Sequence, residues 1–321
     1  MKILFICDPI EELNQSKDST VFLIRSAWER CYETSVCTFE NLNVLSSSSG
    51  TDVFAKTTEI ITPNNNVTNT WWEKSKTEDT PLSKFDVIFI RTDPPFDQRY
   101  SAATLLLQVA ESNGVKIFNS PKSLINHNEK LSTLDFYKYT IPTLISSEKK
   151  DLISFTQSFE KIVFKPLNEM GGNGVFIVEN NDPNIPSIIQ ILTKKGETKI
   201  IAQQFIPQIQ SGDKRILILN GEVVNCCLTR TPKKGSYIGN LAAGGHASIQ
   251  PLTNRDRQIA KEIAGKLSPV GFFILGIDII GDYLTEINVT SPTGFQEISK
   301  LSEIDLAELF YSQVNNILGR V

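Results

Sequence analysis

The order of strand-like and helical segments before residue 119 limits this chain to a small set of folds. Apolar runs at Lys2–Cys7, Phe85–Ile90 and Val115–Phe118 are typical of buried strands. Helical patterns occupy about 19–31 and about 98–112. Strands that alternate with helices usually pair in parallel. We therefore expect an N-terminal α/β domain built on a parallel sheet.

From residue 119 onwards the pattern changes to hairpins and shorter helices. Three pairs of strand-like segments are separated by polar or glycine-containing turns: Lys161–Pro166 with Val175–Glu179, Lys214–Leu219 with Glu222–Arg230, and Gly271–Ile280 with Leu284–Val289. Helices are expected at about 185–195, 254–267 and 304–317. This mixture predicts a second domain of the α+β type, which begins near residue 123.

The composition restricts the chemistry that this chain can perform. Its 32 Lys and Arg against 36 Asp and Glu give a net charge of −4, which argues against binding nucleic acid or an anionic membrane. With only His127 and His246, a multi-histidine metal site is excluded. Five scattered cysteines without C-x-x-C spacing favour a reducing compartment, so we expect a cytoplasmic protein. Any metal should have carboxylate and amide ligands, which select hard cations such as Mg²⁺.

A glycine-rich segment, Lys165–Gly174, joins the first pair of strands. It matches neither the P-loop nor the dinucleotide-binding glycine pattern. Glycines between antiparallel strands can still let backbone N–H groups close over phosphates, and Lys165 would add a positive charge. An ordinary flexible hairpin is the alternative that this segment alone leaves open.

The second hairpin is predicted to carry two arginines and an aspartate on one face. Asn220–Gly221 is a strong signal for a two-residue turn, which pairs Leu219 with Glu222 and Arg215 with Cys226. Alternation then places these residues on one face: Asp213, Arg215, Leu217, Cys226 and Arg230. Such charges are costly in a core, so the face should meet either anionic ligand groups or solvent.

The third hairpin carries two carboxylates and an amide. A two-residue turn at Gly281–Asp282 would place Asp278 and Glu286 on opposite faces. A three-residue loop that includes Tyr283 places them directly across from each other, with Asn288 on the same face. We predict the three-residue loop and a Mg²⁺ site formed by these side chains. Acids on an exposed hairpin are the alternative interpretation.

Several polar segments are expected to be loops. Ser46–Gly50 and Asn64–Asn66 are of low complexity and should be solvated. Thr231–Ser248 is rich in Gly, Ala and Ser and longer than most connections, so we expect a lid over the site. His246 in this connection and His127 are expected to be solvated loop histidines.

These motifs together resemble those of the prokaryotic-type glutathione synthetases of the ATP-grasp superfamily. The resemblance runs nearly end to end and is carried by Arg91–Asp97, Asn128–Lys130, Lys165–Leu167, Met170–Gly174, Gly212–Arg215, Gly239–Gly245, Asp278–Asp282 and Thr285–Thr293. It implies an N-terminal α/β substrate-binding domain at 1–122 and an ATP-grasp domain at 123–321. The latter would comprise a central lid subdomain at about 123–202 and a C-terminal subdomain at about 203–321.

The resemblance also implies an activity. Members of this family join γ-glutamylcysteine to glycine with ATP through an acyl-phosphate, giving glutathione, ADP and phosphate. Mg²⁺ is the implied cofactor, with Mn²⁺ as a substitute, and a homodimer or homotetramer is expected. Two alternatives are an ATP-grasp ligase for another peptide or amine and a nucleotide-binding protein without turnover.

By match to the family motifs, the nucleotide and the metal would have the following ligands. ATP would contact Lys130, Lys165, Met170, Gly171, Gly172, Gly174, Gln203, Gln204, Phe205, Ile206 and Asp213. The metal would be held by Asp278, Glu286 and Asn288, and the catalytic residues would be Arg215, Arg230 and Asn240.

The peptide substrate would contact Asp18, Ser19, Arg91, Ser291, Pro292 and Thr293. Free N–H groups at the Ser19–Thr20 helix start would suit a carboxylate. The chain departs from the family at Gln296 and at His246, where members often carry arginine. Both positions could face a substrate carboxylate, so substrate affinity or identity is where this chain is expected to differ.

Overall fold

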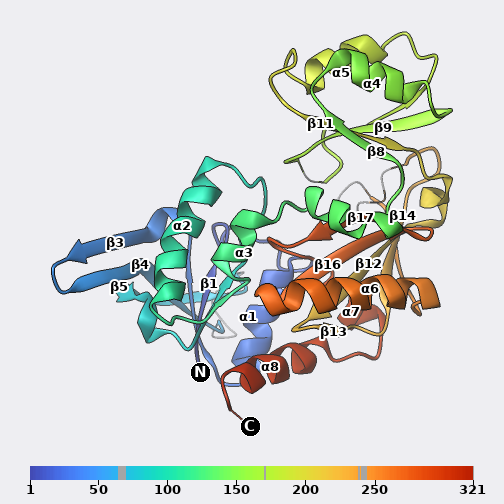
Figure 1. The fold of residues 1–321 in the computed structure, drawn as a ribbon. Coiled ribbons are helices and arrows are strands. Elements are labelled where there is room, and N and C mark those ends of the chain that lie inside the picture. The colour runs from blue at the N-terminus through green and yellow to red at the C-terminus, as the bar shows by residue number, and fades with distance from the viewer. Residues whose placement is uncertain (64–69, 170, 238, 240–243, 321) are drawn as a thin grey trace.

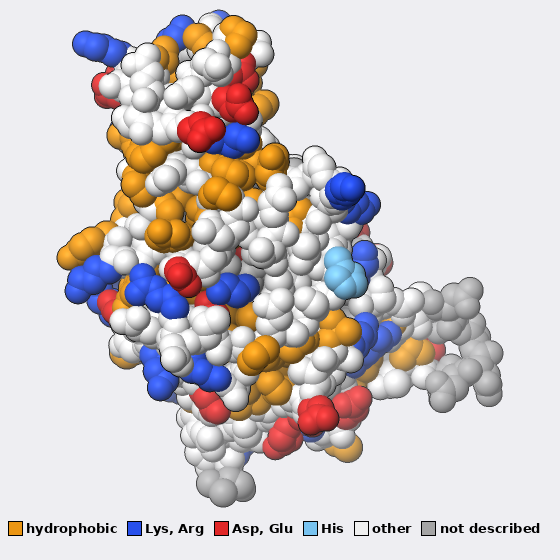
Figure 2. Space-filling model, turned by 90° about the vertical axis from the view of Figure 1, so that its right-hand side faces the viewer, with side chains coloured by type: hydrophobic (Ala, Val, Ile, Leu, Met, Phe, Trp, Pro, Cys, Tyr) orange, Lys and Arg blue, Asp and Glu red, His pale blue; other side chains and the backbone are white. Residues whose placement is uncertain are grey.

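The computed structural model describes residues 1–63, 70–169, 171–237, 239 and 244–320. Within these residues the chain forms three sheets of seven, four and six strands, which we call the N-terminal, small and C-terminal sheets. The small sheet and its two helices form a separate lobe at the top of Figure 1, and both termini lie at the bottom. Hydrophobic side chains gather where this lobe meets the rest of the molecule (Figure 2).

The centre of the N-terminal sheet is parallel, as predicted. Strands β1 (Lys2–Ile6), β2 (Glu33–Cys37), β6 (Val87–Ile90) and β7 (Ile117–Phe118) pair in parallel in the order β2-β1-β6-β7. Helices α1 (Ser19–Glu29) and α2 (Gln98–Ser112) lie close to the expected bounds. Side chains of Asp18 and Asp97 cap the two helices, which explains why both starts are readable from local sequence.

The rest of the N-terminal sheet corrects the prediction. Strands β3 (Leu42–Ser47), β4 (Gly50–Ile61) and β5 (Glu73–Pro81) form an antiparallel extension on β2, so the sheet is mixed. Ser46 and Ser47 therefore belong to a strand, although we expected a loop. These strands are polar because Thr and Ser hydroxyls pair across them, as between Thr58 and Thr77 at 3.0 Å. Asn64–Asn66 lie outside the described residues.

The small sheet has the order β10-β9-β11-β8. Its antiparallel strands are β8 (Thr143–Ser146), β9 (Lys161–Pro166), β10 (Phe176–Glu179) and β11 (Ile200–Gln204). Helices α4 (Lys149–Thr156) and α5 (Ile185–Leu192) cover the upper face in Figure 1 and complete a core of buried aliphatic side chains and Phe164. The predicted β9–β10 hairpin is confirmed.

The C-terminal sheet has the order β15-β14-β12-β16-β17, with β13 paired to β12. The strands are β12 (Asp213–Leu219), β13 (Glu222–Val223), β14 (Cys227–Thr231), β15 (His246–Gln250), β16 (Ile274–Ile280) and β17 (Tyr283–Asn288). His246 is thus paired with Thr231 in a strand and is exposed there, which corrects the loop prediction. The connection shortens to residues 232–245.

Helices on both faces bury the C-terminal sheet. Helix α6 (Asn254–Leu267) packs on one face, and α7 (Phe295–Leu301) and α8 (Leu306–Ile317) on the other. Phe310 of α8 also packs against Phe89 of the N-terminal sheet, at 5.1 Å between ring centroids. The two large sheets therefore share one apolar core.

Short helices connect the main elements. They are α3 (Pro121–Asn126), η1 (Phe39–Asn41), η2 (Leu82–Lys84), η3 (Leu131–Tyr139), η4 (Pro207–Ser211) and η6 (Ser268–Val270). In the described part of the chain, no helix is long and apolar enough to cross a membrane.

The register of the β12 hairpin differs from the prediction. Leu219 pairs with Glu222 as expected, but Arg215 pairs with Leu228 and not with Cys226. The partner strand is interrupted between β13 and β14, which adds two residues. An even shift preserves the alternation of faces, so Asp213, Arg215 and Arg230 still share one face.

The β16–β17 hairpin has the predicted pairing of Asp278 with Glu286, but its turn differs from the predicted one. Ile280 pairs with Tyr283, so the turn has two residues and the expected three-residue loop is wrong. A β-bulge after Asp278 makes Thr285 an extra residue, and Asp278 consequently pairs with Glu286. In a regular two-residue hairpin, Glu286 would point to the face opposite to Asp278. The extra residue in the bulge brings both side chains to the same face.

Candidate active site

A cavity of about 700 Å³ lies between the small sheet and the C-terminal sheet. Strands β9 and β11 form one wall, and β12, β14, β16 and β17 form the opposite wall. At one end the cavity is lined by residues of the N-terminal domain and the start of α7. Side chains from two sheets and from loops of the N-terminal part of the chain can therefore contact one bound molecule.

A buried ion cluster lies on the wall formed by the C-terminal sheet. Arg215 donates to both carboxylate oxygens of Asp278, at 2.5 and 2.8 Å, and Arg230 lies 3.0 Å from Asp278 Oδ2. Arg230 also pairs with Asp213. Burial alone would raise the pKa of Asp278, but the two arginines hold it well below its usual range. Asp278 is thus ionised at neutral pH, and both arginines that pair with it line the cavity.

Two oxygen-bearing side chains of β17 flank this cluster. Glu286 lies directly across from Asp278, and Asn288 donates from Nδ2 to Asp278 Oδ2 at 3.2 Å and to the carbonyl of Gly276 at 3.1 Å. The amide oxygen of Asn288 is therefore the atom that these bonds leave unused. All three predicted metal ligands line the cavity.

These ligands form a mixed donor set. Within the described residues, no group of three or more His, Cys, Asp or Glu side chains could hold a metal. A cation held by Asp278, Glu286 and Asn288 would have two carboxylates and an amide oxygen as ligands, a donor set that suits Mg²⁺. Among the residues that the structure describes, Asp213 Oδ1 and Arg230 Nε are buried near the cluster without a hydrogen-bond partner, as expected of a site that receives a polar ligand.

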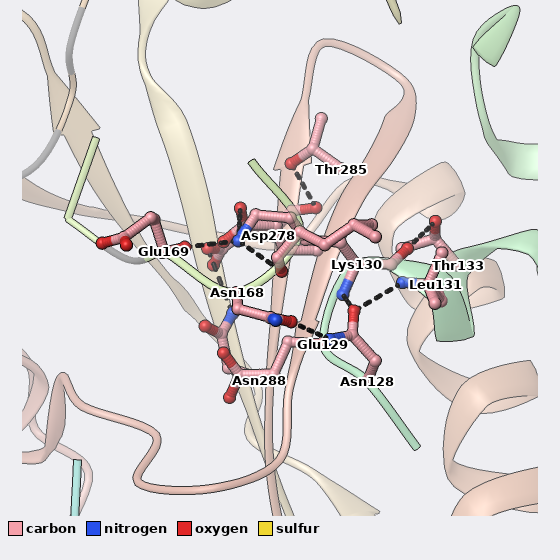
Figure 3. A network of polar contacts seen from close by, with 12 residues as sticks. Asn128, Glu129, Lys130, Leu131, Thr133, Asn168, Glu169, Asp278, Thr285 and Asn288 are labelled. Carbon is pink, nitrogen blue, oxygen red and sulfur yellow. Dashed lines mark hydrogen bonds and ion pairs between the residues drawn. The ribbon is translucent and has the colours of Figure 1, made fainter. Parts of the chain in front are cut away.

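Two lysines, Lys130 and Lys165, also line the cavity, and Figure 3 shows Lys130. Lys130 Nζ donates to the carbonyls of Leu167 and Glu169, at 3.4 and 2.5 Å, and lies 4.0 Å from Glu286 Oε1. Burial lowers the pKa of Lys165 and nearby Lys130 lowers it further, while Glu286 opposes the shift. Two lysines next to a glycine loop form a surface that an anion would stabilise.

The residues before Lys130 connect the two walls. Asn128 Oδ1 accepts from the amides of Lys130 and Leu131, both at 3.0 Å, and its Nδ2 donates to Asn168 at 3.3 Å (Figure 3). Asn128 thereby joins the base of the glycine loop to the segment that carries Lys130.

Glu129 is a residue to which the sequence reasoning gave no role. Its Oε1 accepts from the amides of Val289 and Thr290 and from the Thr290 hydroxyl, at 2.8–3.2 Å. Its carbonyl accepts from Ile287 N at 2.9 Å. Burial and nearby Glu286 raise its pKa, and the Thr290 bonds oppose this. Its position beside Lys130 was the signal available in the sequence.

The glycine loop matches its prediction in part. Gly171 and Gly172 line the cavity with positive φ angles of 69° and 88°, so their backbone can approach a ligand closely. Gly174 does not line the cavity, and a Cβ added there would lie 3.1 Å from the Pro166 side chain. Met170 lies outside the described residues.

The predicted hinge residues, Gln203, Gln204, Phe205 and Ile206, all line the cavity. Sequence reasoning missed Tyr237, whose ring packs edge-on against Phe205 at 5.2 Å. Lys161 Nζ lies over both rings, at 5.4 and 5.6 Å. The connection between β14 and β15 thus contacts the hinge. Asn240, in the same connection, lies outside the described residues.

The six predicted peptide contacts fall into two groups. Asp18, Ser291 and Thr293 line the cavity, whereas Ser19, Arg91 and Pro292 do not. Ser19 Oγ accepts from the amides of Gly294 and Phe295, and Arg91 Nη2 donates to the Pro292 carbonyl at 3.0 Å. This second group therefore supports the loop that carries Ser291 and Thr293.

Two further expectations about this end are corrected. The helix start is not free, because Asp18 Oδ1 already accepts from the amides of Thr20 and Val21. Gln296 does not line the cavity. Its Nε2 donates to the carbonyls of Gln15 and Asp18, so it holds the loop before α1.

Comparison with known proteins shows which family this chain belongs to. Residues 1–124 match the N-terminal domain of prokaryotic glutathione synthetase, and residues 129–303 match its ATP-grasp domain. The chain belongs to the prokaryotic glutathione synthetase family. The glutathione synthetase of Nitrosomonas europaea is 40% identical over 320 residues, covering 100% of this chain and 99% of that protein. That of Neisseria meningitidis serogroup B is 42% identical over 316 residues, covering 98% of each.

Solved structures agree on the fold. The D-cycloserine synthetase DcsG superposes with a TM-score of 0.66 at 13% identity, covering 98% of this chain and 99% of that one. The ATP-grasp ligase PsnB, complexed with a minimal precursor, gives 0.65 at 14% identity, covering 97% and 98%. The α/β and ATP-grasp prediction is therefore confirmed, and family membership makes this chain an ATP-dependent ligase of glutathione synthesis.

Proposed function

We propose that this cavity joins γ-glutamylcysteine to glycine at the expense of ATP. The observation that carries the proposal is the Arg215–Asp278–Arg230 cluster facing Glu286 and Asn288 in the same cavity as Lys130 and Lys165. Positive side chains on two walls of the cavity would stabilise both the phosphates of ATP and the carboxylate that receives the phosphoryl group.

ATP would lie between the small sheet and the C-terminal sheet. Its adenine would contact Gln203–Ile206, and its phosphates would meet Lys130, Lys165 and the backbone of Gly171 and Gly172. Lys130 Nζ, which binds loop carbonyls here, would exchange them for phosphate oxygens. We assign Asp213 to the same site, and Met170 and Gly174 to the loop that closes it.

The donor set described above fits Mg²⁺, or Mn²⁺ in its place. Asp278, Glu286 and Asn288 would hold the ion, which would neutralise phosphate charge and orient the transferring group. Asp278 is already shared by two arginines, so Glu286 and Asn288 offer the less engaged oxygens.

The chain's own residues would guide two steps. The cysteinyl carboxylate attacks the γ-phosphorus and ADP leaves, while Arg215 and Arg230 stabilise the charge on the transferring group. The neutral amine of glycine then attacks the acyl carbon, phosphate leaves with the bridging oxygen, and the amine proton is released. Asn240 would help to enclose the acyl-phosphate. Neither step requires a histidine.

The peptide would lie toward the N-terminal domain. Asp18, Ser291 and Thr293 would contact it directly, with Ser19, Arg91 and Pro292 behind them. From the family resemblance we also propose domains at 1–122 and 123–321, with subdomains that meet near residue 202. A homodimer or homotetramer and a cytoplasmic location are proposed on the same grounds.

An omission assay tests the proposal. Purified protein receives ATP, Mg²⁺, γ-glutamylcysteine and glycine, and phosphate release is followed while each component is left out in turn. We expect release only with all four. Release without glycine would overturn the proposed reaction, as would turnover with other dipeptides but none with γ-glutamylcysteine.

A further inference from the structure

Strand β17 carries two of the three proposed metal ligands on an edge of the C-terminal sheet. It is the last strand in the order of this sheet, and within the described residues it pairs only with β16. The N–H groups of β17 that point away from β16 therefore need partners from outside the sheet. Glu129 accepts hydrogen bonds from two such groups, at Ile287 and Val289.

These bonds lie on both sides of the proposed metal ligand Asn288. The Glu129 carbonyl oxygen accepts from Ile287 N at 2.9 Å. Its side-chain Oε1 accepts from the amides of Val289 and Thr290, at 3.1 and 3.2 Å, and from the Thr290 hydroxyl at 2.8 Å. Glu129 therefore fixes the backbone immediately before and after Asn288.

The orientation of Asn288 leaves little freedom for a metal ligand. Its Nδ2 donates to the Gly276 carbonyl at 3.1 Å and to Asp278 Oδ2 at 3.2 Å, so the amide oxygen is the atom left for a cation. A shift of the backbone would turn this oxygen away from Glu286, the ligand two residues earlier. Partners that hold a metal ligand in place commonly decide how tightly the metal binds.

The neighbours of Glu129 in the chain contact the glycine loop. Lys130 Nζ donates to two carbonyls of this loop and lies 4.0 Å from Glu286 Oε1. On the other side of Glu129, Asn128 donates to Asn168 at 3.3 Å. Three consecutive residues thus connect the glycine loop to strand β17 (Figure 3).

We infer that Glu129 is a positioning residue, which holds the metal ligand Asn288 at a fixed spacing from the phosphate-binding Lys130. The inference rests on the proposed function, because it concerns the metal and the phosphates of ATP. The role requires an acceptor oxygen and not a negative charge, since all three side-chain bonds of Glu129 are accepted by Oε1.

Two variants separate the acceptor from the charge. Glu129→Gln keeps an acceptor oxygen and removes the charge, whereas Glu129→Met keeps the length of the side chain and removes the acceptor. The measurement is the equilibrium affinity for a non-hydrolysable ATP analogue, with and without Mn²⁺ as the metal probe. The ratio of the two affinities is the metal enhancement.

Glu129→Met should lose about tenfold or more of the metal enhancement, which is typical when a partner of a metal ligand is removed. Its affinity for the analogue without metal should stay within about threefold of wild type, because Asn128 still holds the Lys130 amide. Glu129→Gln should keep the metal enhancement within about threefold. Glu197→Met, at an exposed position outside the cavity, is the matched control and should behave as wild type.

Amide hydrogen exchange in the ligand-free proteins tests the cause directly. The amides of Val289 and Thr290 should exchange about tenfold faster or more in Glu129→Met than in wild type, because both lose their acceptor. In Glu129→Gln and in the control, they should exchange at about the wild-type rate.

A folded Glu129→Met with the wild-type metal enhancement, or with unchanged exchange at both amides, would overturn the inference. An equal loss of metal enhancement in Glu129→Gln and Glu129→Met would also overturn it, because the charge would then be what matters. If Glu129→Met does not fold, Thr290→Val removes one of the three donors and should lower the enhancement by about threefold; an unchanged value would again overturn the inference. A wild-type protein whose affinity for the analogue does not rise with Mn²⁺ would instead contradict the proposed function.

Discussion

At the scale of single residues, the site depends on how Asp278 is compensated. A buried carboxylate is costly, and here two guanidinium groups and the Asn288 amide satisfy it. Substituting Asp278 would leave Arg215 and Arg230 with uncompensated charge. A loss of activity in such a variant could then come from a less stable fold as well as from a damaged catalytic site. Glu286 is the better probe, because 30% of its side chain remains exposed and its nearest cation is 4.0 Å away.

We therefore predict that Glu286→Gln lowers kcat by about a hundredfold or more, because the change removes a charge facing the phosphate chain. Its free energy of unfolding should stay within about 1 kcal/mol of wild type. Glu197→Gln, at an exposed position outside the cavity, is the control. Steady-state kinetics and urea denaturation are the measurements, and normal turnover in Glu286→Gln would mean that the metal site lies elsewhere.

Asp93 gives a prediction about pH and stability. Its pKa is raised from 3.8 to about 6, so folding takes up a proton between these values and ionised Asp93 destabilises the fold above pH 6. Asp93→Asn should add about 3 kcal/mol to the free energy of unfolding at pH 8, and roughly half as much at pH 5, since one pKa unit corresponds to about 1.4 kcal/mol. Urea denaturation of both proteins at the two pH values measures this. An equal effect at pH 5 and pH 8 would contradict a raised pKa.

At the scale of elements, helix ends could be predicted from nearby residues, whereas several strands could not. Helices α1, α2 and α6 begin and end close to where their caps and stop signals predict, because those contacts lie within a few residues. Strands β3–β5 were missed because they are polar and held partly by Thr–Thr contacts, although β3 and β4 are neighbours in sequence and Ser47 pairs with Gly50. Apolar periodicity carries no trace of such contacts.

The hairpin registers show the same limit. The pairing of Asp278 with Glu286 was predicted correctly, but through a three-residue loop that does not exist. A single bulged residue, Thr285, gives the same result, and a bulge leaves no reliable mark in a short polar stretch. The expectation that two carboxylates and an amide share one face therefore predicted the pairing correctly, whereas the expected turn length was wrong.

The bulge supplies a test at this scale. Deleting Thr285 should give a regular two-residue hairpin in which Asp278 still faces Glu286, because only the extra residue is removed. Turnover should stay within about tenfold of wild type, far above that of Glu286→Gln. If the deletion is as inactive as Glu286→Gln while circular dichroism shows a folded protein, the bulge itself shapes the site.

At the scale of the whole molecule, the cavity lies between the small sheet and the C-terminal sheet, and loops of the N-terminal part of the chain line one end of it. The N-terminal and C-terminal sheets share a core through α8, while the small sheet forms a lobe of its own above them (Figure 1). The motifs of the ATP-grasp domain could be recognised along the sequence, and most of their residues line the cavity. Lys17 was not found in that way, because it lies in a loop that only the assembled fold brings to the cavity.

In the reaction proposed above, the carboxylate of γ-glutamylcysteine is phosphorylated before glycine attacks. The direct measurement uses γ-glutamylcysteine labelled with ¹⁸O in its cysteinyl carboxylate, with mass analysis of the phosphate released during glycine-dependent turnover. Because the bridging oxygen leaves with phosphate, we expect one ¹⁸O atom in each phosphate formed. Unlabelled phosphate, released at the same rate as the peptide product, would contradict it.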